Sequence, residues 1–268
     1  MTATGFDSKT ISDAIHTKWT GNTVHFVEKT ESTNLLAKCL ADGGAPHGML
    51  VVTEFQTAGR GRFERRWQAP KGSSVMMSLL LRPAFAPQAA PMLTLVMGLS
   101  VAQAVQDLGL AGEIKWPNDV VLSRKKICGI LTEMHLDGAG IGDVIIGVGI
   151  NVNLTDIPLE LQDKATSLCL EAGHSFDRNQ VVAEVLERFE KNYGIFEKTC
   201  DLSGLKAEYE AILANFERPV RVLEKDNSYE GIALGIDEQG ALLVRRKDGK
   251  LSRVDSGEVS VRGLYEYV

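Results

Sequence analysis

The sequence predicts an α+β fold in which helices flank a mixed central β-sheet, followed by a small C-terminal β-barrel or sandwich. Strand-like and helix-like segments mix over residues 1–216 without any repeat period. Residues 217–268 instead carry five short strand-like runs that are separated by turns. We therefore expect two domains, a main domain over 1–216 and a small β domain over 217–268.

The first elements follow from caps, glycines and apolar runs. An amphipathic piece at 11–19 precedes a strand at 23–27. A helix begins near Thr33, because Ser32 or Thr33 can cap its first amide groups, and Gly43-Gly44 can end it. The apolar run at 49–55 indicates a buried strand that leads into an arginine-rich loop at 59–70.

The remaining elements alternate between the two periodicities. A strand at 73–81 is followed by apolar residues at helical spacing over 90–108, with Gly109 as the stop. Strands are predicted at 113–116, 119–122, 126–135 and 143–153, and helices at 179–196 and 203–215. The predicted C-terminal strands are 220–223, 229–236, 241–245, 251–254 and 259–261.

Composition is that of an ordinary globular protein, with 44% hydrophobic and 24% charged residues. A net charge of −6 argues against a surface built throughout for nucleic acid. The scattered cysteines (Cys39, Cys128, Cys169 and Cys200) indicate a reducing compartment and no structural zinc. The polar, charge-interrupted N-terminus resembles neither a signal peptide nor a membrane span, so we expect a cytoplasmic protein with no membrane partner.

The loop at 59–70 is the segment that folding explains least, since it crowds four arginines and Trp67 together. Like charges repel, so such a cluster favours an external anion, and Gly59 and Gly61 let the backbone approach it. A solvated surface loop or a nucleic-acid contact would also suit the charges. Trp67 is costly to leave on a mobile surface, which favours anion binding.

Three further segments carry candidate chemistry. The segment Lys115-Trp116-Pro117-Asn118-Asp119 has two interpretations. Its Pro-Asn-Asp residues are favoured in turns for structural reasons alone. Alternatively, Lys115 binds a phosphate or carboxylate while Asn118 and Asp119 contact a ribose or a hydrated magnesium ion. Gly129 in the strand after Lys126 suggests close approach of a flat ligand, with Cys128 a small core residue. The glycines at 147–153 lack a dinucleotide-binding setting, and Asn151 is expected to point into the site.

Taken in order, five motifs resemble the biotin–protein ligases, and the likeness runs from about residue 23 to the C-terminus. They are Glu31-Ser32-Thr33-Asn34, Gln56-Thr57-Ala58-Gly59-Arg60-Gly61-Arg62 with Trp67, Lys115-Trp116-Pro117-Asn118-Asp119, Lys126-Ile127-Cys128-Gly129-Ile130 and Gly149-Ile150-Asn151. Each alone is weak, but the ordered set is highly specific. The resemblance implies a class II aminoacyl-tRNA synthetase/biotin ligase-like sheet and an SH3-like C-terminal barrel.

The resemblance also implies a reaction. Biotin reacts with ATP to give biotinyl-5′-AMP, and pyrophosphate leaves with Mg²⁺. A lysine of the biotin carboxyl carrier protein of acetyl-CoA carboxylase then takes the biotin. Other biotin-dependent carboxylases are further candidate acceptors. Biotin and ATP act as substrates, Mg²⁺ arrives with ATP, and neither a prosthetic group nor a set of metal ligands is assigned.

Site roles carried over from the family are expectations for individual residues. The catalytic candidates are Lys115, Lys126 and Arg62. Those for biotin are Ser32, Thr33, Asn34, Gln56, Arg60, Gly61, Arg62, Lys126 and Gly129. Those for ATP or the adenylate are Arg62, Arg65, Trp67, Lys115, Asn118, Asp119, Lys126 and Asn151.

Departures and rivals qualify the resemblance. Only about twenty residues precede the first strand, so the likeness is to short ligases without a DNA-binding repressor module, and no DNA partner is expected. Phe63-Glu64 replaces a more basic or glycine-containing dipeptide of some relatives, which bears on how the loop folds over the ligand. A lipoate–protein ligase, or a phosphate-contacting nucleic-acid-binding protein, is the alternative reading. The sequence leaves a homodimer open.

Overall fold

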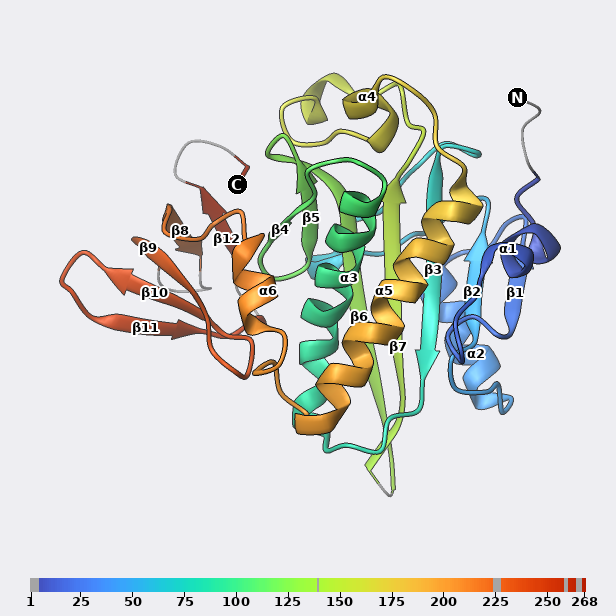
Figure 1. Ribbon diagram of the computed structural model, residues 1–268, viewed down its shortest axis with the longest axis horizontal. Helices are drawn as coiled ribbons and strands as arrows, with labels where there is room; N and C mark the ends of the chain where they lie inside the picture. The colour runs from blue at the N-terminus through green and yellow to red at the C-terminus, as the bar shows by residue number, and fades with distance from the viewer. Residues whose placement is uncertain (1–4, 139, 224–227, 258–259, 264–266) are drawn as a thin grey trace.

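A mixed seven-stranded sheet forms the middle of the computed structural model, which describes residues 5–138, 140–223, 228–257, 260–263 and 267–268 (Figure 1). Its spatial order is β1-β2-β3-β7-β6-β5-β4. Among the described strands of this sheet, β1 and β2 run parallel and the other neighbours are antiparallel. The strands are β1 (Val24–Val27), β2 (Leu50–Thr53), β3 (Ser74–Leu81), β4 (Glu113–Lys115), β5 (Asp119–Leu122), β6 (Lys125–Asp137) and β7 (Gly140–Asn151).

Helices cover the two faces of this sheet unequally. α3 (Leu93–Asp107) and α5 (Arg178–Thr199) pack together on one face, and α2 (Thr33–Asp42) lies on the other (Figure 1). Successive side chains of β2 point to opposite faces of the sheet. Leu50 and Val52 therefore pack in the core beneath α3, whereas Val51 packs with α2. The remaining helices are α1 (Ser8–Ala14), α4 (Leu168–Ala172), α6 (Lys206–Ala211) and the short 3-10 turns Arg62–Glu64, Pro87–Met92 and Leu159–Leu161.

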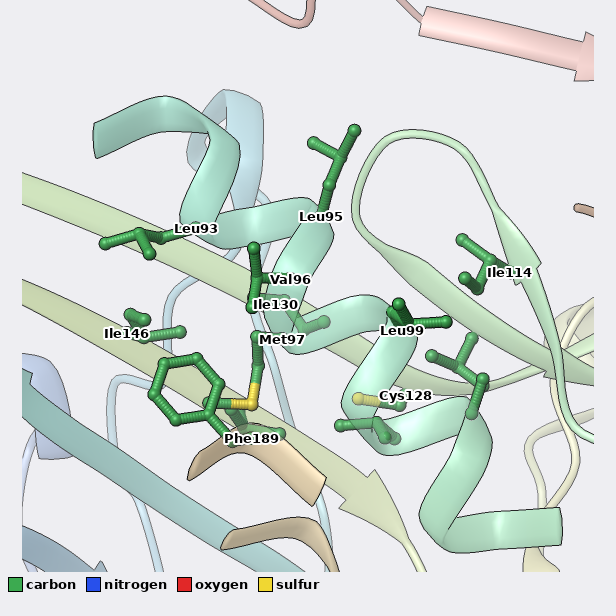
Figure 2. Packing of buried hydrophobic residues seen from close by; sticks show 14 of the residues in the cluster. Leu93, Leu95, Val96, Met97, Leu99, Ile114, Cys128, Ile130, Ile146 and Phe189 are labelled. Carbon is green, nitrogen blue, oxygen red and sulfur yellow. The ribbon is translucent and has the colours of Figure 1, made fainter. Parts of the chain in front are cut away.

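The main core lies between α3, α5 and the sheet. Figure 2 shows Leu93, Val96 and Met97 of α3 facing Ile146 of β7 and Phe189 of α5. By length and composition, the described segment Pro87–Asp107 is apolar enough to cross a membrane, yet 78% of its most apolar window is buried inside the protein. A helix covered on both sides is apolar all round, which accounts for this composition.

The C-terminal residues form a separate antiparallel sheet of order β11-β10-β9-β8-β12, beside β4 and α6 (Figure 1). Its strands are β8 (Pro219–Leu223), β9 (Ser228–Ile236), β10 (Leu242–Arg246), β11 (Leu251–Val254) and β12 (Ser260–Gly263). All five predicted strands occur, except that residue 259 lies outside the described part. The predicted closed barrel is not observed, because no β11–β12 pairing joins the two edges among the described residues. Closure depends on strand tilt and stagger, which short alternating runs do not encode.

Two predicted segments differ from the structure at their ends. The amphipathic piece expected at 11–19 is a helix that begins earlier, because Asp7 caps it, and ends before residues 18–20, whose backbone amides donate to the Glu190 carboxylate. The helix predicted at 203–215 is only α6, because the chain then pairs with the sheet edge: Ala214 N–H donates to Ile114 O. The short helix α4 was not predicted.

Candidate functional site

A cavity of about 1020 Å³ opens on the α2 side of the sheet, bounded by the arginine loop (residues 59–70), the β4–β5 turn, β6, β7 and the C-terminal sheet. Basic side chains far outnumber the acidic ones that line it, Asp119 and Asp163. The basic residues are Arg60, Arg62, Arg65, Arg66, Lys115, Arg124, Lys125, Lys126, Lys164, Arg221 and Arg262. A protein with net charge −6 thus concentrates positive potential in one place.

All but one of the residues singled out from the sequence line this cavity. They are Ser32, Thr33, Asn34, Gln56, Arg60, Gly61, Arg62, Arg65, Trp67, Lys115, Asn118, Asp119, Lys126 and Gly129. The exception is Asn151, which does not line the cavity and whose buried side-chain amide donates to Thr166 O at 3.0 Å. Segments separated by up to a hundred residues of chain therefore meet at one site, although the roles of these residues remain predictions.

One wall is a connected hydrogen-bond network at the start of α2. Gln56 Oε1 accepts from the Thr33 backbone N–H at 2.8 Å and from its hydroxyl at 3.2 Å. The Ser78 hydroxyl lies 2.8 Å from Thr33 Oγ1 and 2.6 Å from Asn34 Oδ1. Asn34 Nδ2 donates to Glu133 Oε2 at 2.7 Å. Buried polar groups satisfied in this way hold a fixed arrangement, so the wall is preorganised.

The N-terminus of α2 differs from its predicted capping. Ser32 occupies the cap position, but its side chain forms no capping hydrogen bond. Gln56, from the segment after β2, accepts the first helical N–H instead. The side-chain carbonyl of Gln56 satisfies the Thr33 N–H as well as a local hydroxyl would. It could not be predicted from the neighbouring sequence, because the fold brings Gln56 to the helix. The buried Ser32 side chain therefore lines the cavity and forms no capping hydrogen bond.

Trp67 lies flat against the sheet where two glycines are paired across β6 and β7. Gly129 faces Gly149 in register. A Cβ at position 149 would lie 2.5 Å from Trp67 Cε2, and one at position 129 would lie 3.3 Å from Trp67 Cζ3 and 3.0 Å from Lys126 Nζ. The glycines therefore make room for the indole, which packs directly on them and gives the cavity an apolar surface.

The arginine loop is a small hairpin. Arg60 and Arg66 form a bridge, and Trp67 N–H donates to Gly59 O at 2.9 Å. Phe63 at the tip has φ 56°, a left-handed conformation that costs energy for a bulky residue. Across the cavity, Arg60 Nη2 lies 3.5 Å from Glu133 Oε1, which joins the loop to the α2 network.

Arg62 connects three parts of the site. Its Nη1 donates to Asn118 Oδ1 at 3.0 Å, and its Nη2 donates to the backbone oxygens of Ser256 and Gly257 in the C-terminal sheet domain. Asn118 Nδ2 in turn donates to Ile130 O at 3.1 Å. The arginine loop, the β4–β5 turn and the C-terminal domain are thus held together at one guanidinium.

One buried carboxylate, that of Asp119, holds two lysines of the cation cluster. Lys126 Nζ lies 2.6 Å from Asp119 Oδ1, and Lys115 Nζ lies 4.0 Å from Asp119 Oδ2. Burial alone would raise the pKa of Asp119, but the charges of Lys126 and Lys115 and hydrogen bonds from Lys126 and Tyr267 hold that pKa below its ordinary value. Asp119 is therefore ionised and committed to its lysines.

Lys115 is almost fully buried, and burial lowers its pKa to about 8 against the attraction of Asp119. The neighbouring charges of Lys126, Arg262 and Arg65 lower it further. A desolvated ammonium with few counter-charges gains strongly from a phosphate placed beside it. Lys115 is thus suited to an anionic ligand on the side of the cavity nearest the C-terminal sheet.

Sequence reasoning missed the cavity residues Arg221, Arg262 and Tyr267, and also Ser78 and Glu133, which hold Asn34 from behind the cavity wall. The two arginines are paired across β8 and β12. Nothing in the local pattern of those strands shows that their edge faces the main domain. One contact between the two sheets is made by Trp116, whose indole N–H donates to Gly240 O at 2.9 Å, so an expected turn residue links them.

The described residues contain no group of three or more His, Cys, Asp or Glu side chains placed to hold a metal ion. Cys128 is fully buried, and burial raises the pKa of its thiol, which fits a core residue. The cavity therefore offers positive charge, hydrogen-bond donors and the apolar surface of Trp67. This set suits a reaction that joins two anions by bringing them together.

Comparison with known proteins gives a consistent result. A family model described as the Biotin/lipoate A/B protein ligase family matches residues 25–151, and one described as the Biotin protein ligase C terminal domain matches residues 216–262. The bifunctional ligase/repressor BirA of Bacillus subtilis is 38% identical over 92% of this chain and 76% of its own length. The biotin–[acetyl-CoA-carboxylase] ligase of Mycobacterium tuberculosis is 35% identical over 87% of this chain and 86% of its own.

A solved structure of biotin protein ligase from Aquifex aeolicus in complex with biotin and ATP aligns with a TM-score of 0.78. It is 31% identical and covers 90% of this chain and 99% of that chain. A ligand-free structure of the same ligase aligns with a TM-score of 0.75 at 28% identity, over 90% of this chain and 99% of that one. The similarity thus extends over both sheets described above.

Proposed function

This chain belongs to the biotin protein ligase family, and from that premise we propose that it attaches biotin to a lysine of the biotin carboxyl carrier protein of acetyl-CoA carboxylase through biotinyl-5′-AMP. The single observation that carries the proposal is the cavity in which a preorganised polar wall, the apolar surface of Trp67 and a cluster of cations converge. The wall suits a ureido ring, the apolar surface an aliphatic chain, and the cations a carboxylate beside a triphosphate.

The first step joins two anions. In our proposal a biotin carboxylate oxygen attacks the α-phosphorus of ATP and pyrophosphate leaves with the Mg²⁺ that ATP brought. Lys126 and Lys115, which share Asp119, neutralise the charge that builds on the α-phosphate and the leaving group. Arg65 and Arg262 extend the positive field toward the pyrophosphate.

Biotin is assigned to the α2 side of the cavity. Ser32, Thr33, Asn34 and Gln56 supply polar groups for the ureido ring, and Arg60, Gly61 and Gly129 border the chain. The apolar surface of Trp67 lies next to Lys126, whose Nζ is 5.9 Å from the indole centroid. The carboxylate of a ligand whose aliphatic chain lies along this surface would therefore reach the lysine pair.

The second step requires that the mixed anhydride meet an amine rather than water. The arginine loop, tied by Arg60 to Glu133 and by Arg62 to the C-terminal domain, is proposed to cover the intermediate. The acceptor ε-amine then attacks the acyl carbon, AMP leaves, and the amine proton is lost to solvent or phosphate. We assign residues 1–216 to catalysis and 217–268 to the closing domain, and we expect a cytoplasmic enzyme.

The deciding experiment incubates the protein with biotin, Mg-ATP and a biotin-acceptor domain, and measures the mass of the acceptor. One biotinyl addition is expected, and Lys126→Ala should slow adenylate formation by several kcal/mol of barrier, about what one preorganised charge supplies. Lys191→Ala, on the exposed face of α5, is the matched control and should act as the parent. Lipoate transfer without biotin transfer would reject the proposal.

A further inference from the structure

Tyr267 lies inside the cation cluster although it comes from the far end of the chain. Its hydroxyl donates a hydrogen bond to Asp119 Oδ2. Its ring lies over Lys115, with Nζ 4.0 Å from the ring centroid. One side chain thus touches both the carboxylate that organises the cluster and one of the two lysines that the carboxylate holds.

The position of Tyr267 is built into the fold. The next residue, Val268, is buried against Val121 of β5 and Ala214, and its backbone oxygen accepts from Arg124 Nη2 at 2.6 Å. Burial raises the pKa of the Tyr267 hydroxyl, so this group keeps its proton and remains a donor at neutral pH. The contacts of Val268 with the main sheet therefore keep Tyr267 next to β5, the strand that carries Asp119.

Asp119 needs such a partner. A buried carboxylate is stable only when both oxygens are engaged, and Oδ1 is committed to Lys126 at 2.6 Å. Lys115 stands 4.0 Å from Oδ2, too far for a hydrogen bond. Without the tyrosine hydroxyl, Oδ2 would lose its hydrogen bond and the carboxylate could rotate, so that Lys126 would no longer point in one direction.

We propose that Tyr267 is a positioning residue for adenylate formation, whose hydroxyl fixes the rotation of Asp119 and thereby aims Lys126 at the reacting phosphate. The inference rests on the proposed adenylation step. It assigns no contact between Tyr267 and the α-phosphorus or the biotin carboxylate. The ring has a second, smaller role, because it covers Lys115 and keeps its ammonium from water.

Two variants separate the hydroxyl from the ring. Tyr267→Phe keeps the ring over Lys115 and removes only the hydrogen bond to Asp119, whereas Tyr267→Leu removes both. Each variant is assayed in single turnover for adenylate formation with biotin and Mg-ATP, and separately for transfer from biotinyl-adenylate supplied ready-made. The matched control is Tyr229→Phe. Tyr229 lies in the C-terminal sheet, and its ring also contacts a basic side chain, that of Arg246.

A hydrogen bond to a buried charge supports a loss of about tenfold or more when it is removed. We expect Tyr267→Phe to form adenylate about tenfold more slowly with an unchanged KM for biotin and unchanged transfer of supplied adenylate. Tyr267→Leu should be slower still and should also raise the KM for ATP. Tyr229→Phe should match the parent in each assay.

A parental rate of adenylate formation in Tyr267→Phe overturns the inference. It is also overturned if adenylate formation and transfer fall together with the melting temperature, since that pattern belongs to a residue that only stabilises the fold. A parent protein that forms no biotinyl-adenylate overturns the proposed function, and with it the premise of this inference, so the two failures are distinguishable.

Discussion

Replacing Lys115 by methionine should stabilise the protein below pH 8 while impairing adenylate formation. The ammonium is almost fully buried, and the pKa of Lys115 falls from 10.5 to about 8, first because of burial. At 1.36 kcal/mol per unit, the buried charge costs about 3 kcal/mol of folding free energy wherever both states are protonated. Methionine fills similar space without a charge to desolvate.

The sign of the pH dependence follows from the folded pKa lying below the unfolded one. Below pH 8 both states carry the proton and the whole cost is present. Between pH 8 and about 10.5 the unfolded chain keeps the proton that the folded protein has lost, so the cost declines as pH rises. The stability of the parent relative to Lys115→Met should therefore rise by about 3 kcal/mol across this window.

The measurement is urea-induced unfolding of parent and Lys115→Met at pH 7, 8, 9 and 10, compared as a difference so that other titrations cancel. Lys191→Met, at an exposed position on α5, controls for the loss of a lysine as such. Asp119 stays ionised throughout this range and adds no slope. A difference between parent and Lys115→Met that does not change with pH would refute the reasoning, because a fully charged lysine in both states gives no slope.

The same lysine should couple ATP binding to proton uptake. A triphosphate beside Lys115 supplies the counter-charge that burial removed, so its pKa should rise on binding. At pH 9, where the free protein has lost most of this proton, we expect uptake of close to one proton per ATP. Calorimetry in two buffers of different ionisation enthalpy measures it, and zero uptake would place the phosphates away from Lys115.

Three other substitutions test the cover over the site. Arg62→Ala removes the link between loop, turn and C-terminal domain, so adenylate should leak to water, and equal retention in variant and parent would exclude a gating role. Gly149→Ala places a Cβ 2.5 Å from Trp67, so tryptophan fluorescence should change and adenylate retention should fall, whereas Gly194→Ala meets nothing within 4 Å and should do neither. Glu133→Gln keeps the side-chain length but removes the charge that faces Arg60 of the loop. The affinity for biotin should fall by no more than about fivefold, because a partly exposed ion pair contributes little. A larger loss would indicate that Glu133 acts through the α2 network instead.

The extent to which the sequence predicted this protein differs between elements. Strands and the long helices were predicted where their apolar residues repeat with the period of the element, as in α5 and β8, or form an unbroken run, as in β3. The shortened α6 was not, because Ile114 competes for the backbone of residues 212–214 and that partner lies a hundred residues away. Tertiary pairing of this kind leaves no mark on the local pattern.

The candidate site divides in the same way. Charged and glycine-rich motifs such as those at Arg62, Lys115 and Gly129 stand out, because folding alone gives little reason for them. Ser78 and Glu133 do not stand out, since each is an ordinary strand residue whose meaning comes from Asn34 on another element. Asn151 shows the converse error, because a residue inside a motif can serve the backbone of its own neighbourhood rather than the cavity.

The C-terminal part of the chain supplies some of the contacts that hold the cation cluster. Charges as crowded as Lys115, Lys126 and Arg62 repel, and Asp119 alone supplies too little negative charge among them. The C-terminal domain contributes what the main domain lacks: backbone oxygens for Arg62 and a ring and hydroxyl for the Lys115–Asp119 pair. Tyr267, the described partner of Lys115 from this part of the chain, is uncharged at neutral pH, so it covers the lysine without cancelling its charge. The charge of Lys115 therefore remains available to an anion, which a further carboxylate at that position would have reduced.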